Sequence, residues 1–395
     1  MRQRILIAGA GIGGIVAALA LLRHGFDVAL YEQAAELREL GAGVQISPNG
    51  SRVLIELGLG PAMASIAAIP VAKEMRLFNT GQAWRVQDLG AEAEARFGSP
   101  YWLVHRGDFH ALLVRALEKQ APGAVRVGAR AIGFEQDTDG VALHLEGGER
   151  VRGDALIGAD GVHSQIRAAL FGPGRATFTG FMAWRGVVPM DRLPPRLRQQ
   201  YGMTWIGPHG HVVTYPLRRG ELLNFVTAIE RDDWLVESWS EAGTVEECRC
   251  DLALWHDDVL AIVDAIDIPY KWAMLGREPL ERWSVGRVSL LGDACHPTLP
   301  FLAQGANMAI EDGMVLARCL AAYPVAEALR HYDAARIDRT SRIVRGSLEN
   351  VSRYHNPQLG DPVQAQAFMQ REFAPRAMGA RYDWLYEYDA LTVPV

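Results

Sequence analysis

Three glycines near the start of the chain, Gly9, Gly11 and Gly14, stand at the spacing used to bind a dinucleotide. In such a turn the first glycine permits the tight bend, the second lets the backbone approach a pyrophosphate, and the third lets the helix pack on the strand. Glu32 lies eighteen residues after Gly14, where a carboxylate accepts hydrogen bonds from ribose hydroxyls. This combination predicts a dinucleotide site.

The elements that must position these residues are indicated by the apolar runs around them. Residues 5–8 precede the glycines and residues 15–22 follow them, so we expect a strand, a turn that includes Gly13, and a helix. The N–H groups and positive dipole end of that helix face the phosphates. The uncharged stretch also resembles a secretory signal or a membrane span. The glycines within it and the strand at 27–31 that carries Glu32 argue against export.

Two further apolar strands end in turns that contain glycine and aspartate. The run at 155–158 leads to Asp160, with Ser164 as the expected N-cap of the next helix. The run at 288–291 leads to Asp293. Each is thus a buried strand that ends in a turn with glycine and an acidic residue.

The middle of the chain differs in amino-acid composition from the segments on either side. Residues 178–274 are rich in tryptophan, at positions 184, 205, 234, 239, 255 and 272, and indicate an antiparallel sheet that covers a pocket. Its strand-like runs are 183–188, 211–216 and 222–229. Other strands are expected within 74–89 and at 125–128, 131–136 and 141–146. Helices are expected at 51–57, 109–120 with Asp108 as N-cap, 251–266 and 308–321.

Composition excludes several classes of function. The chain has 395 residues, 49% of them apolar and 22% charged, which is ordinary for a globular protein of two or three folding units. A net charge of −6 without a basic run gives no support for nucleic-acid binding. The four cysteines are too few for a disulfide framework and offer no matched pair of metal ligands. We therefore expect no metal site, no membrane partner and a cytoplasmic location.

Taken together, the three turns resemble those of the single-component FAD-dependent aromatic hydroxylases, the group typified by p-hydroxybenzoate hydroxylase. The resemblance covers essentially the whole chain and is strongest toward the salicylate, 3-hydroxybenzoate and 6-hydroxynicotinate monooxygenases. It is carried further by residues 41–45, 184–186, 215–218 and 303–312. It implies an α/β fold, with a Rossmann-like FAD-binding domain, an inserted antiparallel-sheet substrate domain and a helical C-terminal region.

The same resemblance implies a role for each matched position along FAD. Glu32 holds the adenosine ribose, and Asp293 bonds the ribityl chain. The turn at Asp160 serves FAD and the transient nicotinamide. Other positions along the cofactor are Gln33, Gln45, Arg106 and Ala131. The backbone of Gly305, Ala306 and Asn307, at a helix N-terminus, faces the flavin edge that becomes negative on reduction.

The implied reaction is hydroxylation of a small aromatic acid with O2 and NADH or NADPH, through a flavin C4a-hydroperoxide. His211 and Tyr215 are the candidate bases for the substrate's phenol, because in a strand they share one face with Val213. A structural, hydrogen-bonded His211 is the alternative, and His296 is a competing histidine beside the Asp293 turn. Further substrate contacts are expected at Trp184, Arg185, Pro300 and Phe301. Arg185 and Arg218 are candidates for a substrate carboxylate, with ion pairing inside the protein as the alternative.

Two departures from the family pattern bear on the substrate. Gln45 stands where the 6-hydroxynicotinate enzymes carry histidine, and Pro300 stands where the 3-hydroxybenzoate 6-hydroxylases carry glutamine. The lip at Pro300 and Phe301 is more like that of the salicylate-type enzymes, so a carboxylated phenol or hydroxypyridine is expected. A hydroxylase or epoxidase of a larger polyketide- or quinone-like substrate, and a flavin-binding scaffold without turnover, remain alternatives. The exact substrate and position, decarboxylation, NADH against NADPH, and a homodimer stay open.

The expected boundaries alternate between the two domains. The FAD-binding domain is assembled from residues 1–73, 101–177 and 276–340. Residues 74–100 and 178–275 supply the substrate domain, and residues 341–395 form the helical C-terminal region.

Overall fold

The structure, a computed structural model, describes residues 2–37, 42–174, 177–231 and 241–395. Gly41, in one of the stretches that carry the resemblance, lies outside the described residues, as do Trp234 and Trp239. Within the described part the fold is mixed α/β with a helical C-terminus, as the sequence predicts.

A five-stranded parallel sheet organises the first half of the fold, in the order β17-β11-β1-β2-β7. Its strands are β1 (Arg4–Ala8), β2 (Asp27–Tyr31), β7 (Val125–Arg126), β11 (Ala155–Gly158) and β17 (Val288–Leu290). The central strands are fully buried, because helices pack on this sheet. The helices whose side chains join that core include α1 (Ile12–Arg23), α5 (Arg106–Gln120), α9 (Gly305–Ala322) and α10 (Val325–Glu349).

A seven-stranded sheet, in the order β16-β12-β15-β14-β13-β4-β5, forms the second large layer. All its pairings are antiparallel except the one between β13 and β4. The strands are β4 (Ala72–Leu77), β5 (Ala83–Asp88), β12 (Thr177–Pro189), β13 (Tyr201–Gly207), β14 (Gly210–Leu217), β15 (Leu222–Glu230) and β16 (Tyr270–Gly276). One face packs on α7 (Val245–Asp251) and α8 (Asp257–Asp264).

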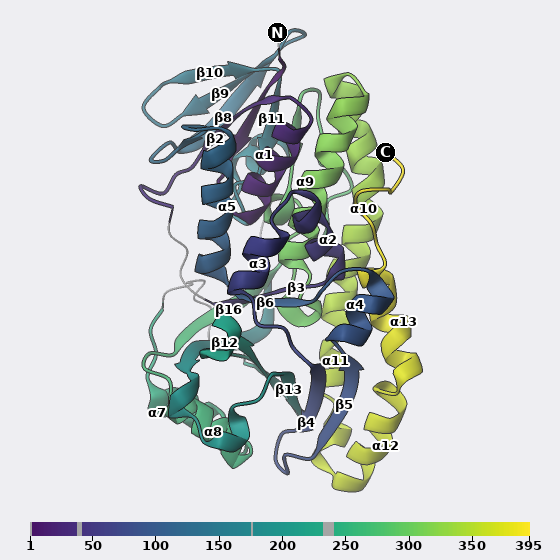
Figure 1. Cartoon of the computed structure of the whole chain (residues 1–395). Coiled ribbons are helices and arrows are strands. Elements are labelled where there is room, and N and C mark those ends of the chain that lie inside the picture. The colour runs from purple at the N-terminus through teal and green to yellow at the C-terminus, as the bar shows by residue number, and fades with distance from the viewer. Residues whose placement is uncertain (1, 38–41, 175–176, 232–240) are drawn as a thin grey trace.

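The other face of this sheet packs toward the C-terminal helices, which are α11 (Val351–Tyr354), α12 (Pro362–Glu372) and α13 (Pro375–Tyr386). Figure 1 shows the parallel sheet in the upper half of the molecule, the seven-stranded sheet in the lower half, and α12 and α13 beside β4 and β5. A distant part of the chain is thereby brought against the substrate-side sheet.

Smaller elements complete the fold. Two short strands, β3 (Gly43–Ile46) and β6 (Trp102–His105), pair antiparallel between the large sheets. A three-stranded antiparallel sheet consists of β8 (Ala131–Gln136), β9 (Val141–Leu145) and β10 (Arg150–Gly153). The remaining helices are α2 (Pro48–Glu56), α3 (Gly60–Ile66), α4 (Ala91–Phe97) and α6 (Gln165–Phe171). None of the helices in the described ranges is long and apolar enough to cross a membrane.

Several predicted helix ends were wrong for identifiable reasons. Of the expected helix at 251–266, only Asp257–Asp264 form a helix, α8: α7 ends at Asp251, and the His256 ring accepts from the Asp258 N–H at 3.1 Å to cap α8. Asp108 is not an N-cap: α5 begins at Arg106, and the Asp108 carboxylate lies in its first turn. The predicted cap of α6 is confirmed, since Ser164 Oγ accepts from the Arg167 N–H at 2.9 Å.

The parallel sheet draws β1 and β2 from residues 1–73, β7 and β11 from 101–177, and β17 from 276–340. This is the alternation that the expected boundaries describe, although β4 begins at Ala72 and β12 at Thr177. Whether these segments are separate folding units stays a prediction.

Candidate active site

The first glycine turn joins β1 to α1 and opens toward a cavity. Gly9 has φ +101°, and a Cβ on Gly14 would lie 2.2 Å from the Gly9 carbonyl oxygen, so both glycines are required by the chain's own packing. A Cβ on Gly11 meets nothing within 4 Å, and Gly11, Gly13 and Gly14 all line the cavity. The space beside Gly11 is therefore available to a group from outside the chain.

Glu32 ends β2 beside this turn. Its Oε2 accepts from the Ala10 N–H at 2.9 Å, and its Oε1 accepts from the Ala34 N–H at 2.9 Å. A carboxylate has further lone pairs on both oxygens, so it is fixed in position and still able to accept from ribose hydroxyls. Gln33 is exposed, and Ala131 is buried at the start of β8. None of Glu32, Gln33 and Ala131 is among the residues that line the cavity, and their roles at the cofactor stay predictions.

The Asp160 carboxylate is used within the protein. It accepts from Ser164 Oγ at 2.5 Å and from the Gln165 N–H at 2.8 Å, which fixes the start of α6. Burial raises the pKa of Asp160, against the effect of these hydrogen bonds. Its neighbours Ala159 and Gly161 line the cavity, so the turn contributes backbone there, and the Asp160 side chain does not.

Asp293 lines the cavity in the turn after β17. The Asp312 carboxylate fixes this turn. Its Oδ2 accepts from the Gly292 N–H at 3.1 Å and lies 2.6 Å from His296 Nε2. Burial opposes the ionised form, but His296 and Arg336 lower the pKa of Asp312. His296 therefore supports the loop: Gly292 and Asp293 line the cavity, and His296 and Asp312 do not.

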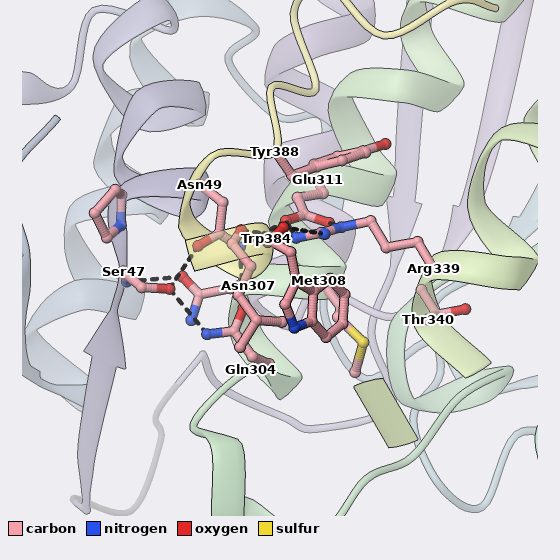
Figure 2. Close-up of polar contacts among 12 residues, drawn as sticks. Ser47, Asn49, Gln304, Asn307, Met308, Glu311, Arg339, Thr340, Trp384 and Tyr388 are labelled. Atoms are coloured by element: carbon pink, nitrogen blue, oxygen red, sulfur yellow. Dashed lines mark hydrogen bonds and ion pairs between the residues drawn. The ribbon is translucent and has the colours of Figure 1, made fainter. Parts of the chain in front are cut away.

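A buried polar network fixes the N-terminus of α9 (Figure 2). Gly305 and Ala306 line the cavity, but Asn307 does not, which corrects its expected place at the flavin edge. Its side chain instead ties α9 to β3, because Nδ2 donates to the Gln45 carbonyl oxygen at 3.0 Å and Oδ1 accepts from the Ser47 N–H at 3.0 Å. The helix end that faces the cavity is thus held rigidly.

The network continues behind this helix end. Asn49 donates to Gln304 at 3.0 Å and to Glu311 at 2.6 Å, and Arg339 donates to both oxygens of Glu311 at 2.8 and 2.9 Å. Burial acts against ionisation of Glu311, but Arg339 and Arg336 hold its pKa below the usual range. Charge buried in this way is paired, as a dry interior requires.

From the seven-stranded sheet, β14 presents His211, Val213 and Tyr215 to the cavity on one face. Pro300 and Phe301 also line the cavity, and the Phe301 ring packs edge-on against the His211 ring, with centroids 5.0 Å apart. Five of the seven residues that the sequence associates with substrate thus line the cavity here, while their chemical roles stay predictions.

His211 is the first member of a chain of polar groups that leads to the surface. Its Nδ1 lies 2.8 Å from His355 Nε2, and His355 Nδ1 lies 2.9 Å from Glu230 Oε1. His211 and His355 are buried, whereas 38% of the Glu230 side chain is exposed. His209, on the surface, contacts the other oxygen of Glu230 at 2.8 Å. This row of groups, His211, His355 and Glu230, is called the histidine relay below.

Tyr215 lines the cavity together with Gln45 and Tyr101. Its ring covers Gly43, where a Cβ would approach the hydroxyl to 2.6 Å. Tyr101 donates to Gln45 Oε1 at 2.7 Å, and Gln45 lines the same cavity. Burial raises the pKa of Tyr215, which favours a neutral hydroxyl and makes it a donor or a proton conduit and not an anionic base.

Two predicted substrate contacts lie elsewhere. Trp184 faces α7, where its indole N–H donates to Asp251 at 2.7 Å in a separate hydrophobic core, so it does not line the cavity. Its neighbour Arg185, on the other face of β12, does line the cavity. Arg218 binds Asp108 through two hydrogen bonds at 2.7 and 2.9 Å, which is the ion-pair alternative.

One cavity of about 730 Å³ joins these groups of residues. Gly11, Asp293 and Ala306, from the elements around the parallel sheet, line it together with His211, Tyr215 and Phe301. The residues present fit FAD: an open glycine turn, a ribose acceptor at Glu32, and a helix N-terminus for a reduced flavin. Arg106 also lines the cavity, at the start of α5.

Sequence reasoning missed four groups at this site. Lys73, Tyr354 and Tyr382 line the cavity, and His355 joins His211 to Glu230. The aromatic content of 382–388 is a visible signal without an assigned role, and no local pattern marks His355.

Comparison with known proteins gives a family match along most of the chain. The model described as FAD binding domain matches residues 2–347. A 3-amino-4-hydroxybenzoate 2-monooxygenase of Streptomyces platensis is 38% identical over 394 residues, which cover 99% of this chain and 98% of that protein. A 6-hydroxynicotinate 3-monooxygenase of Pseudomonas fluorescens is 39% identical over 355 residues, covering 88% and 91%.

A solved structure supports the same relationship. Klebsiella pneumoniae HpxO, complexed with FAD and uric acid, superposes with a TM-score of 0.84 at 28% identity. The match covers 99% of this chain and 97% of that one. The likeness thus extends through both large sheets and the C-terminal helices.

Proposed function

This chain belongs to the FAD binding domain family as an FAD-dependent aromatic monooxygenase, and from that premise we propose that it hydroxylates a small aromatic acid with His211 as the base. Its substrate is a ring that carries both a hydroxyl group and a carboxylate, as the names of the two relatives describe for theirs. O2 and either NADH or NADPH are the co-substrates that this reaction needs.

The observation that carries the proposal is that the glycine turn and His211 line the same cavity. When bound and reduced, FAD activates O2 and supplies one oxygen atom to an electron-rich ring. The protein's part is to hold that ring, to exclude water from it and to remove its phenolic proton. Phe301, Leu302 and Val213 supply apolar surface for the first two tasks.

The histidine relay determines which nitrogen of His211 can act. Burial opposes ionisation of Glu230, but hydrogen bonds from His209 and His355 lower its pKa, so it is a carboxylate that accepts. His355 then carries its proton on Nδ1 and offers Nε2 as an acceptor. His211 must therefore donate from Nδ1, which leaves the Nε2 lone pair free to accept a proton.

The relay also provides a path for the proton. Burial, His355 and Lys73 lower the pKa of His211 well below the ordinary value, so the imidazolium form is disfavoured. A proton accepted at His211 Nε2 is passed on from Nδ1 to His355, whose own Nδ1 proton moves to Glu230. Glu230 is exposed enough to release that proton to water. His211 is thus the base that touches the substrate, and His355 and Glu230 position it and carry its proton.

The direct test uses purified full-length protein. It should be yellow with bound FAD and should oxidise NADH or NADPH faster with the correct acid among 3-amino-4-hydroxybenzoate, 6-hydroxynicotinate, 3-hydroxybenzoate and salicylate. With ¹⁸O₂, mass spectrometry should find one labelled oxygen in the product. Parallel assays with NADH and NADPH identify the reductant, and gel filtration with light scattering tests for a homodimer. A cytoplasmic location, where reduced nicotinamide is available, belongs to the same proposal.

Two outcomes would replace this proposal. Turnover of larger polyketide- or quinone-like compounds, with none of the four acids accepted, would favour the alternative hydroxylase or epoxidase. A protein that binds FAD and turns over neither class would favour the scaffold, and a protein that binds no FAD would contradict the proposal at its base.

A further inference from the structure

A lysine and two tyrosines form a compact polar group at the end of the cavity where the C-terminal helices close it. Lys73 Nζ in β4 lies 3.4 Å from the Tyr354 hydroxyl and 3.2 Å from the Tyr382 hydroxyl. These two hydroxyl groups are 3.2 Å apart, and all three residues line the cavity. We call this group the lysine–tyrosine cluster.

The Lys73 ammonium has no carboxylate partner among the residues that the structure describes. Its contacts are tyrosine hydroxyls and tyrosine rings. Glu74, the next residue, lies on the other face of β4 and pairs with Arg76 at 2.5 Å. An ammonium carries three donors, of which the tyrosines use two, so one N–H remains for a ligand. A cation away from bulk water is costly unless it is paired.

There is also room for a ligand beside it. Gly202 in β13 is opposite Lys73 in the sheet and lines the same cavity. A Cβ at Gly202 would meet only the Ala72 carbonyl oxygen, at 3.9 Å, so the wall next to the ammonium is open. Tyr354 and Tyr382 are almost fully buried, which keeps this end of the cavity dry.

We propose that the lysine–tyrosine cluster binds the carboxylate of the aromatic substrate, with Lys73 as the counter-charge and Tyr354 and Tyr382 as hydroxyl donors. This inference rests on the proposed function, because it assigns the acidic group of the same substrate. The ring between the cluster and the flavin wall then has its hydroxyl group directed at His211. The Tyr354 ring packs against the His211 ring at 5.1 Å, so both ends of the substrate are recognised by neighbouring groups.

Arg185 is the competing cation in the cavity, and its surroundings differ. Its guanidinium lies over the rings of Tyr270 and Trp272 at 5.8 and 5.3 Å. Burial and the nearby charge of Arg106, at the start of α5, lower the pKa of Arg185. Lys73, in contrast, acts electrostatically on His211. A carboxylate at Lys73 keeps the phenol near the base, whereas a carboxylate at Arg185 draws it toward Arg106.

The test titrates FAD-loaded full-length protein with 3-amino-4-hydroxybenzoate and with its neutral carboxamide, and follows the change in flavin absorbance. The wild type should bind the acid more tightly. Lys73→Met should raise the Kd of the acid about 100-fold, as expected when one partner of a buried charge pair is removed, and should change the Kd of the amide by less than about threefold. Lys73→Arg should restore most of the affinity for the acid. Lys119→Met, which removes a surface charge, is the matched control and should match the wild type.

Because Lys73→Met can disturb folding, the double variant Tyr354→Phe, Tyr382→Phe provides a second route. It removes only hydroxyl groups and should weaken acid binding about tenfold while the amide still binds. Equal effects on acid and amide, or loss of acid preference in Arg185→Met but not in Lys73→Met, would overturn the inference. So would a wild type that binds the amide as well as the acid. Failure of the proposed function looks different: the acid would bind through Lys73 and yield no hydroxylated product.

Discussion

His211 Nδ1 lies 2.8 Å from His355 Nε2, although 144 residues separate the two histidines in the sequence. His211 belongs to β14 of the substrate-side sheet, and His355 follows α11 in the C-terminal region. The helical C-terminus therefore contacts the proposed base directly. It also brings Tyr354 and Tyr382 to the cavity wall.

Replacing His211 by asparagine should lower hydroxylation by about 10²- to 10⁴-fold, the usual contribution of a positioned general base. FAD should remain bound, because His211 belongs to β14 and is not part of the glycine turn. Product is measured by chromatography and FAD content by absorbance. The control is His331→Asn, which removes a ring stacked on Tyr323 at 4.0 Å outside the cavity. Full hydroxylation by His211→Asn would show that the histidine is structural.

Replacing Glu230 by glutamine should slow kcat about tenfold, roughly 1.4 kcal/mol, with KM within about twofold of the wild type. Glutamine can still accept a hydrogen bond from His355 but cannot take up its proton. The solvent deuterium isotope effect on kcat should rise, since proton transfer out of the cavity becomes limiting. A role confined to folding would not move that isotope effect. Glu221→Gln, at the exposed start of the same hairpin, is the control.

The pH dependence of wild-type activity gives an independent check on the role of His211. His211 acts as a base only when neutral, and its pKa is lowered in the folded protein by burial, His355 and Lys73. Activity of the wild type should therefore persist as the pH falls through about 6.5, the ordinary histidine pKa, and decline only below it. A decline that begins above pH 7 would contradict the assignment of His211.

Local pattern was enough to predict some of this site. The turn at Gly9, Gly11 and Gly14 and the cap at Ser164 depend on spacing over a few residues, and strand alternation predicts that His211 and Tyr215 share a face. The expectation that Trp184 and Arg185 both contact the substrate conflicts with this alternation. Adjacent residues of a strand point to opposite faces, so only one of the two can line the cavity.

The rest depends on contacts between distant segments. Lys73 and Tyr354 are 281 residues apart, and His355 and Glu230 are 125 apart. Asp108 looked like a helix cap in its local sequence, but its partner Arg218 lies 110 residues away. The contacts of Lys73 with Tyr354 and of His355 with Glu230 follow from how α11 and α13 pack on the seven-stranded sheet. No periodicity within one element specifies that packing.

Substitutions at two glycines should separate cofactor binding from folding. Gly11→Ala adds a methyl group that meets nothing within 4 Å, at a position with an ordinary φ of −72°. The free energy of unfolding of the flavin-free protein should therefore stay within about 0.5 kcal/mol of the wild-type value. Its Kd for FAD should rise at least about tenfold if a pyrophosphate approaches this backbone. Gly14→Ala, whose methyl group would lie 2.2 Å from the Gly9 carbonyl oxygen, should destabilise the flavin-free protein as well. FAD affinity unchanged in Gly11→Ala would remove the phosphates from this turn.

Replacing Arg336 by methionine should cost about 3–5 kcal/mol in the free energy of unfolding, because it removes the counter-charge that two buried carboxylates share. Arg336 is fully buried and lies 2.7 Å from both Glu311 and Asp312. Asp312 holds the Gly292 backbone beside Asp293, so FAD should also bind more weakly. Arg192→Met breaks the exposed pair with Asp267 and should cost less than about 1 kcal/mol, which makes it the matched control in urea unfolding. Equal losses in the two variants would mean that the buried charges are solvated, and that the support beneath the flavin wall does not depend on Arg336.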